Sequence, residues 1–167
     1  KLLRRAIETD KLSSLIFYGT PGCGKTTIAS VIANVTNKFY ASLNAVTDGV
    51  AELRKVTAKA EENLSMYGKQ TILFIDEIHM LNSEGQSEGG ANGLGQLLKP
   101  ALARGTIKCI GATTDEEVGI VYEDRALARR FNKVKVLPLG GNKAITVCGK
   151  ILADYSTAHG LKLEGIT

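Results

Sequence analysis

The sequence predicts an α/β fold built on a doubly wound parallel sheet of five strands. Five short apolar segments alternate with segments in which apolar residues recur at helical spacing. Parallel neighbours need helical crossovers, so helices should cover both faces of the sheet. With 167 residues, 44% of them hydrophobic, the chain can build one core of this kind. The five predicted strands are residues 15–18, 39–43, 71–75, 107–112 and 133–137.

A glycine-rich loop follows the first strand. Residues 19–26 read Gly-Thr-Pro-Gly-Cys-Gly-Lys-Thr, the pattern of a phosphate-binding loop, and a helix is predicted directly after it. In this order, backbone N–H groups and the positive end of the helix converge on one anion. We expect Lys25 to reach the β- and γ-phosphates of a nucleotide and the Thr26 hydroxyl to bind Mg²⁺. The predicted nucleotide-binding residues are Gly19, Thr20, Pro21, Gly22, Cys23, Gly24, Lys25, Thr26 and Thr27.

Two amphipathic helices are predicted in the first half of the chain. The helix after the loop has apolar residues at i, i+3, i+4 and i+7 that should face the sheet, namely Ile28, Val31, Ile32 and Val35. A second helix follows the strand at residues 39–43 and should end at Gly68. Its apolar side is expected to consist of Val50, Leu53, Val56, Ala60 and Leu64.

An acidic pair follows the third predicted strand. This strand, residues 71–75, is apolar on both faces, as expected inside a parallel sheet, and we place it beside the strand that leads into the loop. Asp76 would then hold Mg²⁺ through water, and Glu77 would act as a base or orient the water that attacks the γ-phosphate. ATP and Mg²⁺ are therefore the expected cofactors, and ATP hydrolysis is the expected reaction.

Other interpretations of these residues are weaker. The acidic pair could merely cap the following helix, but a phosphate-binding loop upstream at this spacing disfavours that interpretation. A GTPase would carry Asn-Lys-x-Asp, and neither Asn37-Lys38 nor Asn142-Lys143 is followed by that aspartate. We interpret His79 as a histidine in solvent or at the rim of the core rather than as a catalytic group.

The second half of the chain begins with a stretch too rich in glycine and polar residues to pack. We predict that this stretch, residues 82–95, is a mobile loop. In the helix that follows, Pro100 should produce a kink or start a second short helix, and Gly105 should end it. The strand at residues 133–137 alternates charged and apolar residues, which is typical of a sheet edge. A last amphipathic helix is predicted at residues 142–158.

Composition narrows the class of protein. The net charge of +4 is mild and the basic residues are dispersed, which permits nucleic-acid binding without requiring it. No apolar run approaches the roughly 18 residues of a membrane span, so we expect no membrane partner and a cytoplasmic, intracellular location. The three cysteines lack the spacing of a disulfide framework or zinc site and are expected to be reduced. Because the chain starts without methionine, we expect it to be part of a longer protein.

These motifs, in this order, resemble the AAA+ ATPases. In that family the phosphate-binding loop and the Asp-Glu strand are followed by a polar residue ending the next strand, called sensor 1, and by an arginine lent to a neighbouring subunit. The resemblance implies that Thr114 is sensor 1, with Thr113 as the neighbouring candidate. It also implies that residues 126–131, Ala-Leu-Ala-Arg-Arg-Phe, carry the arginine finger. The predicted catalytic residues are thus Glu77, Thr114, Arg129 and Arg130, and the predicted metal-binding residues are Thr26 and Asp76.

The arginines have a second interpretation, and the resemblance has implications beyond the site. Arg129 and Arg130 could instead end a surface helix and pair with Glu123 or Asp124. With the other motifs present, the arginine finger is the preferred interpretation, and it implies a homo-oligomeric ring in the parent protein. The resemblance also implies that residues 1–138 form the nucleotide-binding core and that residues 139–167 begin a truncated helical lid.

The resemblance differs between the two halves of the chain. Residues 1–81 are similar to the RarA/MgsA replication-associated recombination ATPases, whereas residues 94–160 look like the first ATPase domain of Clp-type unfoldases. Clp-type rings usually grip polypeptide with a Lys-Tyr-x-Gly loop, and residues 44–49 here contain no aromatic residue. We therefore expect a module that remodels a macromolecule, with DNA preferred. The alternatives are a Clp-like protein unfoldase fragment and a truncated module that binds ATP without turnover.

Overall fold

The computed structural model describes residues 2–9, 12–82, 91–141 and 146. The chain divides into two compact units, residues 1–136 and 137–167, and the fold and site described below belong to the first. The helix predicted at residues 142–158 lies outside the described residues, apart from residue 146. Among the described residues, no helix is both long and apolar enough to cross a membrane.

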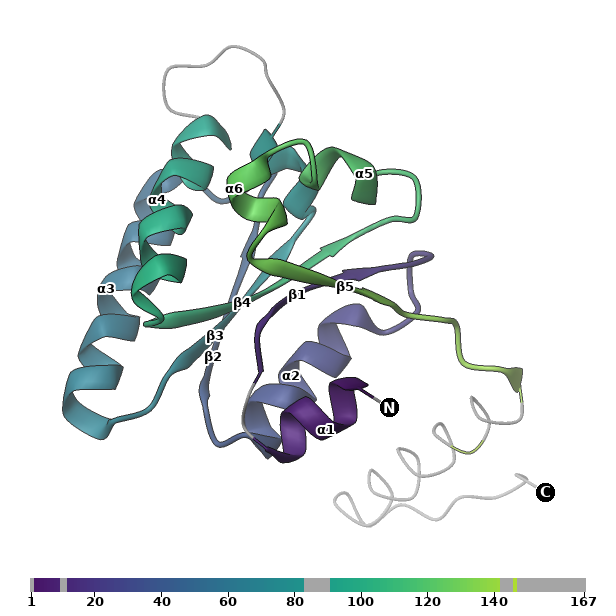
Figure 1. The fold of residues 1–167 in the computed structure, drawn as a ribbon, viewed down its shortest axis with the longest axis horizontal. Coiled ribbons are helices and arrows are strands. Elements are labelled where there is room, and N and C mark those ends of the chain that lie inside the picture. Colours follow the sequence, from purple (N-terminus) through teal and green to yellow (C-terminus); the bar gives the residue numbers. More distant parts are fainter. Residues whose placement is uncertain (1, 10–11, 83–90, 142–145, 147–167) are drawn as a thin grey trace, which may run out of the picture. The chain divides into compact units, whose positions relative to one another are not determined.

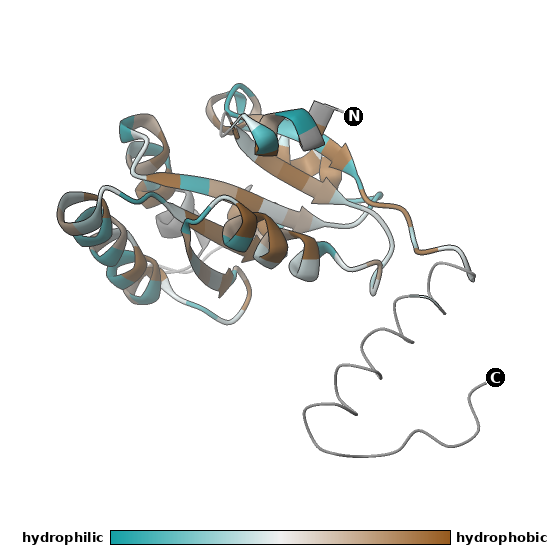
Figure 2. Cartoon of the chain, turned by 90° about the horizontal axis from the view of Figure 1, so that it is seen from below, coloured by the Kyte–Doolittle hydropathy of each residue, from teal (hydrophilic) through white to brown (hydrophobic). Residues whose placement is uncertain are grey.

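A five-stranded parallel sheet forms the centre of the first unit (Figure 1). The predicted α/β architecture is confirmed, because helices cover both faces of this sheet (Figure 2). Every pair of neighbouring strands is parallel, and the order across the sheet is β2-β3-β4-β1-β5. The strands are β1 (Ser14–Tyr18), β2 (Phe39–Asn44), β3 (Thr71–Asp76), β4 (Ile107–Thr113) and β5 (Phe131–Lys135).

One expectation about the strand order is wrong. The acidic strand β3 does not lie beside β1, because β4 lies between them, and Ile110 of β4 pairs with Leu15 on one side and Phe74 on the other. The apolar pattern of β3 shows that it is internal but not which strand is its neighbour, and β4 is just as thoroughly buried. The acidic pair therefore faces the glycine-rich loop across the end of β4.

The two faces of the sheet are covered by different helices. The helix α1 (Leu2–Glu8) and the helix α2 (Lys25–Val35) pack on one face, and α3 (Val50–Tyr67) and α4 (Ala91–Arg104) pack on the other (Figure 1). Alternate residues of β1 divide between the two cores, with Ile16 on the α3/α4 side and Phe17 on the α1/α2 side. Both side chains are fully buried, which anchors the strand that leads into the loop.

The apolar side of α2 differs from the predicted one. Val31 is 52% exposed and Val35 is 68% exposed, whereas Ala29, Ile32 and Ala33 are buried against the sheet. Two alanines on the buried side let the helix axis approach the strands closely, and this turns the valines outward. The prediction for α3 is confirmed at its centre, where Leu53 and Ala60 are buried, and at its end, where Gly68 is left-handed with φ 64°.

Both ends of the segment predicted as a mobile loop, residues 82–95, are helical. A 3₁₀ helix, η1 (Ile78–Asn82), ends at its first residue, and α4 begins at Ala91, so the predicted loop extended too far, while residues 83–90 lie outside the described residues. Pro100 lies inside α4 and does not start a second helix. It occupies an exposed position, where a carbonyl deprived of its N–H donor can bond to water instead. Gly105 follows the helix end with φ 72°.

Two short helices connect β4 to β5. They are α5 (Val118–Val121) and α6 (Arg125–Ala128), and Val121 and Leu127 hold them to the core. The strand β5 lies at the sheet edge as predicted, but it begins at Phe131 rather than at residue 133, because the Phe131 side chain is buried in the core. The two cysteines in the described residues, Cys23 and Cys109, are buried and carry free thiols.

Candidate functional site

A hollow of about 380 Å³ opens where the strands β1, β3 and β4 end. The carboxyl ends of parallel strands meet at one edge of the sheet, and in open α/β sheets ligands bind there. The hollow brings together residues from the loop, the start of α2, the acidic pair and the end of β4. They are Pro21, Gly22, Gly24, Lys25, Thr26, Thr27, Asp76, Glu77, Thr113 and Thr114.

The glycines of the loop serve two different purposes. Gly22 and Gly24 have φ of 75° and 92°, in the left-handed region that residues with a Cβ rarely adopt, although a Cβ at either position would meet no neighbour. Gly19 is different, because a Cβ there would collide with the carbonyl oxygen of Val136. Gly22 and Gly24 thus set the turn of the loop, while Gly19 lets Val136, the residue that follows β5, lie against the base of the loop.

Lys25 lies across the loop. Its ammonium donates to the carbonyl oxygens of Gly19 at 2.9 Å and of Thr20 at 3.1 Å. Gly19, Thr20 and Cys23 do not line the hollow, and Cys23 instead packs into the core below the loop, with Sγ 3.9 Å from the Lys25 ammonium. These contacts fix one cation at the floor of the loop.

The start of α2 supplies further donors for an anion. The helix begins at Lys25 after Gly24, no side chain caps its N-terminus, and its first turn contains no acidic residue. The first N–H groups of a helix lack partners within the helix, and they carry the positive end of the helix dipole. Together with the Lys25 ammonium, this donor set fits a polyphosphate.

The acidic pair ends β3 in an unusual backbone conformation. Glu77 has φ 53°, and its N–H donates to the Asp76 carboxylate at 3.2 Å. The next residue, Ile78, packs directly on Gly111 of β4, where a Cβ would collide with the Ile78 side chain. Asp76 and Thr26 line the same hollow, and a carboxylate with a hydroxyl is an oxygen donor set that suits Mg²⁺.

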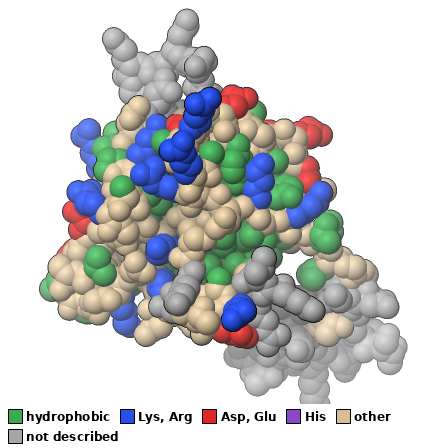
Figure 3. Space-filling view, in the orientation of Figure 1, with side chains coloured by type: hydrophobic (Ala, Val, Ile, Leu, Met, Phe, Trp, Pro, Cys, Tyr) green, Lys and Arg blue, Asp and Glu red, His purple; other side chains and the backbone are tan. Residues whose placement is uncertain are grey.

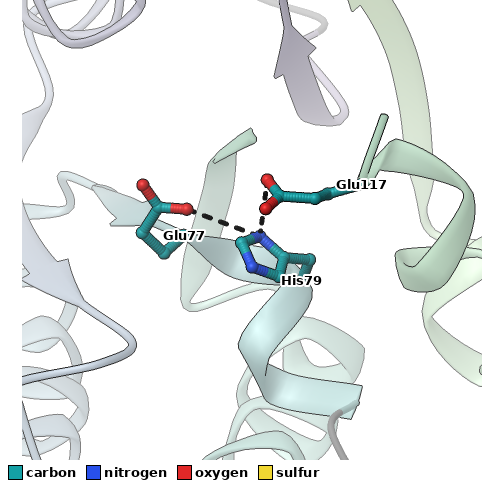
Figure 4. Close-up of side chains that lie close together, drawn as sticks. All are labelled: Glu77, His79 and Glu117. Atoms are coloured by element: carbon teal, nitrogen blue, oxygen red, sulfur yellow. Dashed lines mark ion pairs between the residues drawn. The ribbon is translucent and has the colours of Figure 1, made fainter. Parts of the chain in front are cut away.

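A cluster that the sequence analysis did not predict lies beside the acidic pair. It consists of Glu77, His79 and Glu117, and Figure 4 shows both carboxylates directed at the imidazole. The Nδ1 atom of His79 lies 3.5 Å from Oε2 of Glu77 and 3.3 Å from Oε2 of Glu117. The His79 side chain is only 11% exposed, so the expected position at the rim of the core is correct, but its contacts with the two carboxylates were missed.

The end of β4 connects this cluster to the hollow. The hydroxyls of Thr114 and Thr113 donate to Oε2 of Glu117 at 2.7 and 3.3 Å, and the Glu117 N–H donates back to the Thr114 hydroxyl at 3.3 Å. The hydrogen bond from Thr114 lowers the pKa of Glu117, and His79 acts in the same direction. The spacing Thr-x-x-Glu at residues 114–117 is the sequence signal that indicates this contact.

Most of the chain, including the residues that line the hollow, lies within one known protein family. The model of the family described as "ATPase family associated with various cellular activities (AAA)" matches residues 15–139, well over half of the chain. The chain belongs to the AAA family of ATPases. This membership confirms the resemblance to the AAA+ ATPases on which the predicted site residues were based.

The matching AAA relatives include a recombination protein and a chaperone. Replication-associated recombination protein A of Escherichia coli is 43% identical over 115 residues, which is 69% of this chain and 24% of the relative. The chaperone protein ClpB of Bdellovibrio bacteriovorus is 40% identical over 166 residues, covering 89% of this chain and 19% of the relative. The chain thus spans about a quarter or less of the length of these curated relatives.

Solved structures show the same AAA fold. The Holliday junction branch migration motor RuvB of Thermotoga maritima superposes with a TM-score of 0.63 at 21% identity, over 92% of this chain and 48% of that one. Hsp104 of Saccharomyces cerevisiae, in a complex with casein, superposes with a TM-score of 0.65 at 27% identity, over 96% of this chain and 30% of that one.

The two arginines that the AAA resemblance singled out lie apart from the hollow. Arg129 and Arg130 follow α6, both are exposed, and neither lines the hollow. Figure 3 shows basic side chains gathered over this part of the surface. Arg130 donates to the carbonyl of Ala126 at 2.8 Å, whereas the Arg129 side chain has no hydrogen bond or ion pair within the described part of the AAA core.

In the alternative interpretation, Arg129 and Arg130 pair with Glu123 or Asp124, but Asp124 has other partners. Asp124 accepts hydrogen bonds from the N–H groups of Ala126 and Leu127, which caps α6, and it forms an ion pair of 2.7 Å with Lys99 of α4. Lys99 is the main cause of the lowered pKa of Asp124. This carboxylate therefore anchors α6 to α4 instead of holding Arg129 or Arg130.

Proposed function

We propose that this chain binds Mg²⁺ and ATP in the hollow and hydrolyses the γ-phosphate bond. The observation that carries the proposal is the convergence on one hollow of the loop, Lys25, the acidic pair and the two threonines that end β4. These groups come from segments far apart in the sequence, and a purely structural role would not require them to meet. Bound Mg²⁺ would polarise the phosphate oxygens and neutralise their charge.

Each group has a proposed task in this reaction. Lys25 and the N-terminus of α2 hold the phosphates, and Thr26 and Asp76 hold the metal ion. The side chain of Glu77 is 41% exposed, so it can reach a water molecule in the hollow and take its proton. When the nucleotide is bound, the hydroxyl of Thr114, or of Thr113 beside it, would turn away from Glu117 and donate to the oxygens on which charge develops.

We also propose that the enzyme works as a homo-oligomeric ring. Arg129 and Arg130 are exposed and do not line the hollow of their own chain, which supports a role in the hollow of a neighbouring copy. In such a role one of them would stabilise the charge that develops on the phosphate. Residues 1–138 would be the nucleotide-binding core of each subunit, and residues 139–167 the start of its helical lid.

DNA is the preferred macromolecule for this module to act on. Support comes from the 43% sequence identity with replication-associated recombination protein A and from the structural similarity to a branch migration motor. A Clp-like protein unfoldase is the second candidate, and the longer match to ClpB and the likeness to Hsp104 in a casein complex favour it. The two candidates share the same hydrolytic site and differ in the polymer that stimulates it.

Calorimetry tests the binding step. Titration of Mg²⁺ and ATP into the chain should give saturable heat, and Lys25→Ala should remove it, because the phosphates lose their fixed cation. Lys55→Ala is the matched control, since Lys55 is an exposed lysine on α3 whose ion pair with Glu52 is distant in sequence from the loop. An absence of heat with the unaltered chain would refute the proposed function.

The polymer is tested by stimulation of ATP hydrolysis. Phosphate release by the parent protein is measured with forked DNA, with an unfolded polypeptide such as casein, and with neither. We expect stimulation by DNA. Stimulation by the polypeptide alone would replace the preferred proposal with the unfoldase. ATP binding without hydrolysis under any of the three conditions would indicate a module that binds ATP without turnover.

A further inference from the structure

His79 presents one nitrogen to three oxygen atoms. Its Nδ1 lies 3.3 Å from the Glu117 carboxylate and 3.5 Å from the Glu77 carboxylate (Figure 4). The Thr113 hydroxyl lies 3.1 Å from the same nitrogen. These oxygens come from three elements, namely the turn after β3, the end of β4 and the turn before α5. The imidazole is therefore the point at which the proposed base meets the threonines that line the hollow.

The neighbours of Nδ1 determine which ring nitrogen carries the proton. Carboxylates can only accept hydrogen bonds, so two of the three oxygens around Nδ1 are acceptors whichever way the Thr113 hydroxyl points. When the Thr113 hydroxyl donates to Glu117, its oxygen is a third acceptor for Nδ1. We assign a proton to Nδ1, because an unprotonated Nδ1 would face two carboxylates with lone pairs opposed.

One N–H group cannot satisfy three acceptors. The separations of 3.1 to 3.5 Å are at or beyond the usual length of an N–H···O bond, which indicates a shared donor rather than one committed to a single partner. The backbone around it is held in place by Ile78, which is seated on Gly111 of β4.

We propose that His79 is a positioning residue for Glu77. Its Nδ1–H orients the Glu77 carboxylate, and Glu117 with Thr113 holds the imidazole in the tautomer and direction that this requires. The end of β4 thereby influences the orientation of the proposed base. This inference rests on the proposed role of Glu77 as the base, so its first test uses a measurement that does not depend on hydrolysis.

Nuclear magnetic resonance of the nucleotide-free chain decides the tautomer. The chain contains only two histidines, His79 and His159, so ¹⁵N-histidine labelling gives two sets of ring signals, which His79→Gln assigns. We expect protonated Nδ1 in His79, and Thr113→Val should shift its signal by removing one of the acceptors. Unprotonated Nδ1 with a proton on Nε2 would overturn the proposal, whatever the ATPase activity of the chain.

A pair of amide substitutions then tests positioning in the enzyme. The amide of His79→Asn can place an N–H near the position of Nδ1, whereas the longer His79→Gln places it near Nε2. We expect turnover to fall about tenfold or more in His79→Ala and His79→Gln, to recover substantially in His79→Asn, and ATP affinity to stay within about twofold in all three. Equal turnover in the Asn and Gln variants would overturn the proposal.

The kinetic comparison requires variants that are equally well folded. Thermal unfolding of each variant establishes that the Asn and Gln substitutions leave the fold equally stable. Should the unaltered parent protein bind ATP without hydrolysing it, the proposed function fails, and the resonance measurement still decides the role assigned to the Nδ1 proton.

Discussion

At the scale of single residues, Glu77 combines backbone strain with an exposed carboxylate. It is one of two non-glycine residues with positive φ among the described residues, and the other is an asparagine, Asn37, which tolerates this region better. A residue with a Cβ loses roughly 1–2 kcal/mol in the left-handed region. Strain of this kind is maintained where the surrounding structure enforces it, and here the seat of Ile78 on Gly111 does so.

The carboxylate of Glu77 should be essential for turnover and dispensable for binding. Glu77→Gln keeps the shape of the side chain but removes the base, so we expect phosphate release to fall by about a hundredfold or more with ATP affinity nearly unchanged. Single-turnover hydrolysis and calorimetry measure the two quantities. Glu116→Gln, an exposed neighbour of similar charge outside the hollow, should retain activity, and equal losses of binding and turnover in Glu77→Gln would show that the base is misassigned.

The backbone strain at Glu77 predicts that a residue better suited to positive φ would stabilise the fold at this position, although it would remove the proposed base. Glu77→Asn introduces a residue that adopts positive φ more readily, so we expect it to unfold at a higher urea concentration than Glu77→Gln, by about 0.5–1 kcal/mol in free energy of unfolding. Both variants lose the same charge, which isolates the backbone effect. Identical urea midpoints would mean that the left-handed backbone at Glu77 costs the fold little.

At the scale of elements, the helix α6 owes its place to one carboxylate. Asp124 caps its N-terminus and reaches across to Lys99 of α4, so this short helix, with the arginines that follow it, is fixed to the α3/α4 side of the core. A helix of four residues cannot form from propensity alone. The cap and the ion pair are therefore the main local determinants of where Arg129 projects.

Substitutions of Asp124 should separate the cap from the ion pair. Asp124→Asn preserves a good cap and loses the charge, whereas Asp124→Ala loses both, so we expect the alanine variant to be less stable by about 1 kcal/mol. Urea unfolding measures the difference. An asparagine variant as unstable as the alanine variant would assign the effect to the ion pair instead of the cap.

The lowered pKa of Asp124 predicts that its contribution to the stability of the fold depends on pH. Its pKa is lowered in the folded state, so its stabilising contribution is complete above the unfolded pKa of about 3.9 and is lost as the pH falls through the lower folded value. The stability difference between the unaltered chain and Asp124→Asn should therefore be constant near neutral pH and shrink below about pH 4. A difference that persists at lower pH would contradict this origin.

Much of this arrangement could be predicted from local patterns, and the rest depends on packing. The phosphate-binding loop and the strand before Asp76 are local signals, since their residues act together within a few positions of one another. The position of β4 between β1 and β3 depends on tertiary packing, and the sequence of no single strand determines it. The contact of His79 with Glu117 joins residues 38 positions apart, and it follows only once β3 and β4 are known to be neighbours.

At the scale of the whole molecule, the separation of Arg129 from the hollow of its own chain predicts shared active sites. If a neighbouring copy lends the arginine, specific activity should rise with protein concentration as rings assemble, and Arg129→Ala should lower turnover by about a thousandfold. Arg129 is the better candidate of the two, because the Arg130 guanidinium donates to the Ala126 carbonyl of the preceding helix, α6. Arg125→Ala, an exposed arginine at the start of α6, is the matched control.

Mixing two inactive variants tests this sharing directly. A Glu77→Gln subunit retains its arginine and lacks the base, whereas an Arg129→Ala subunit retains the base and lacks the arginine. In a mixed ring some interfaces combine the intact base of one subunit with the intact arginine of the next, so we expect activity to return when the parent protein's two variants are mixed. Activity strictly proportional to enzyme concentration, with no recovery on mixing, would show that each chain completes its site alone, and Arg129 would then be a surface residue at a helix end.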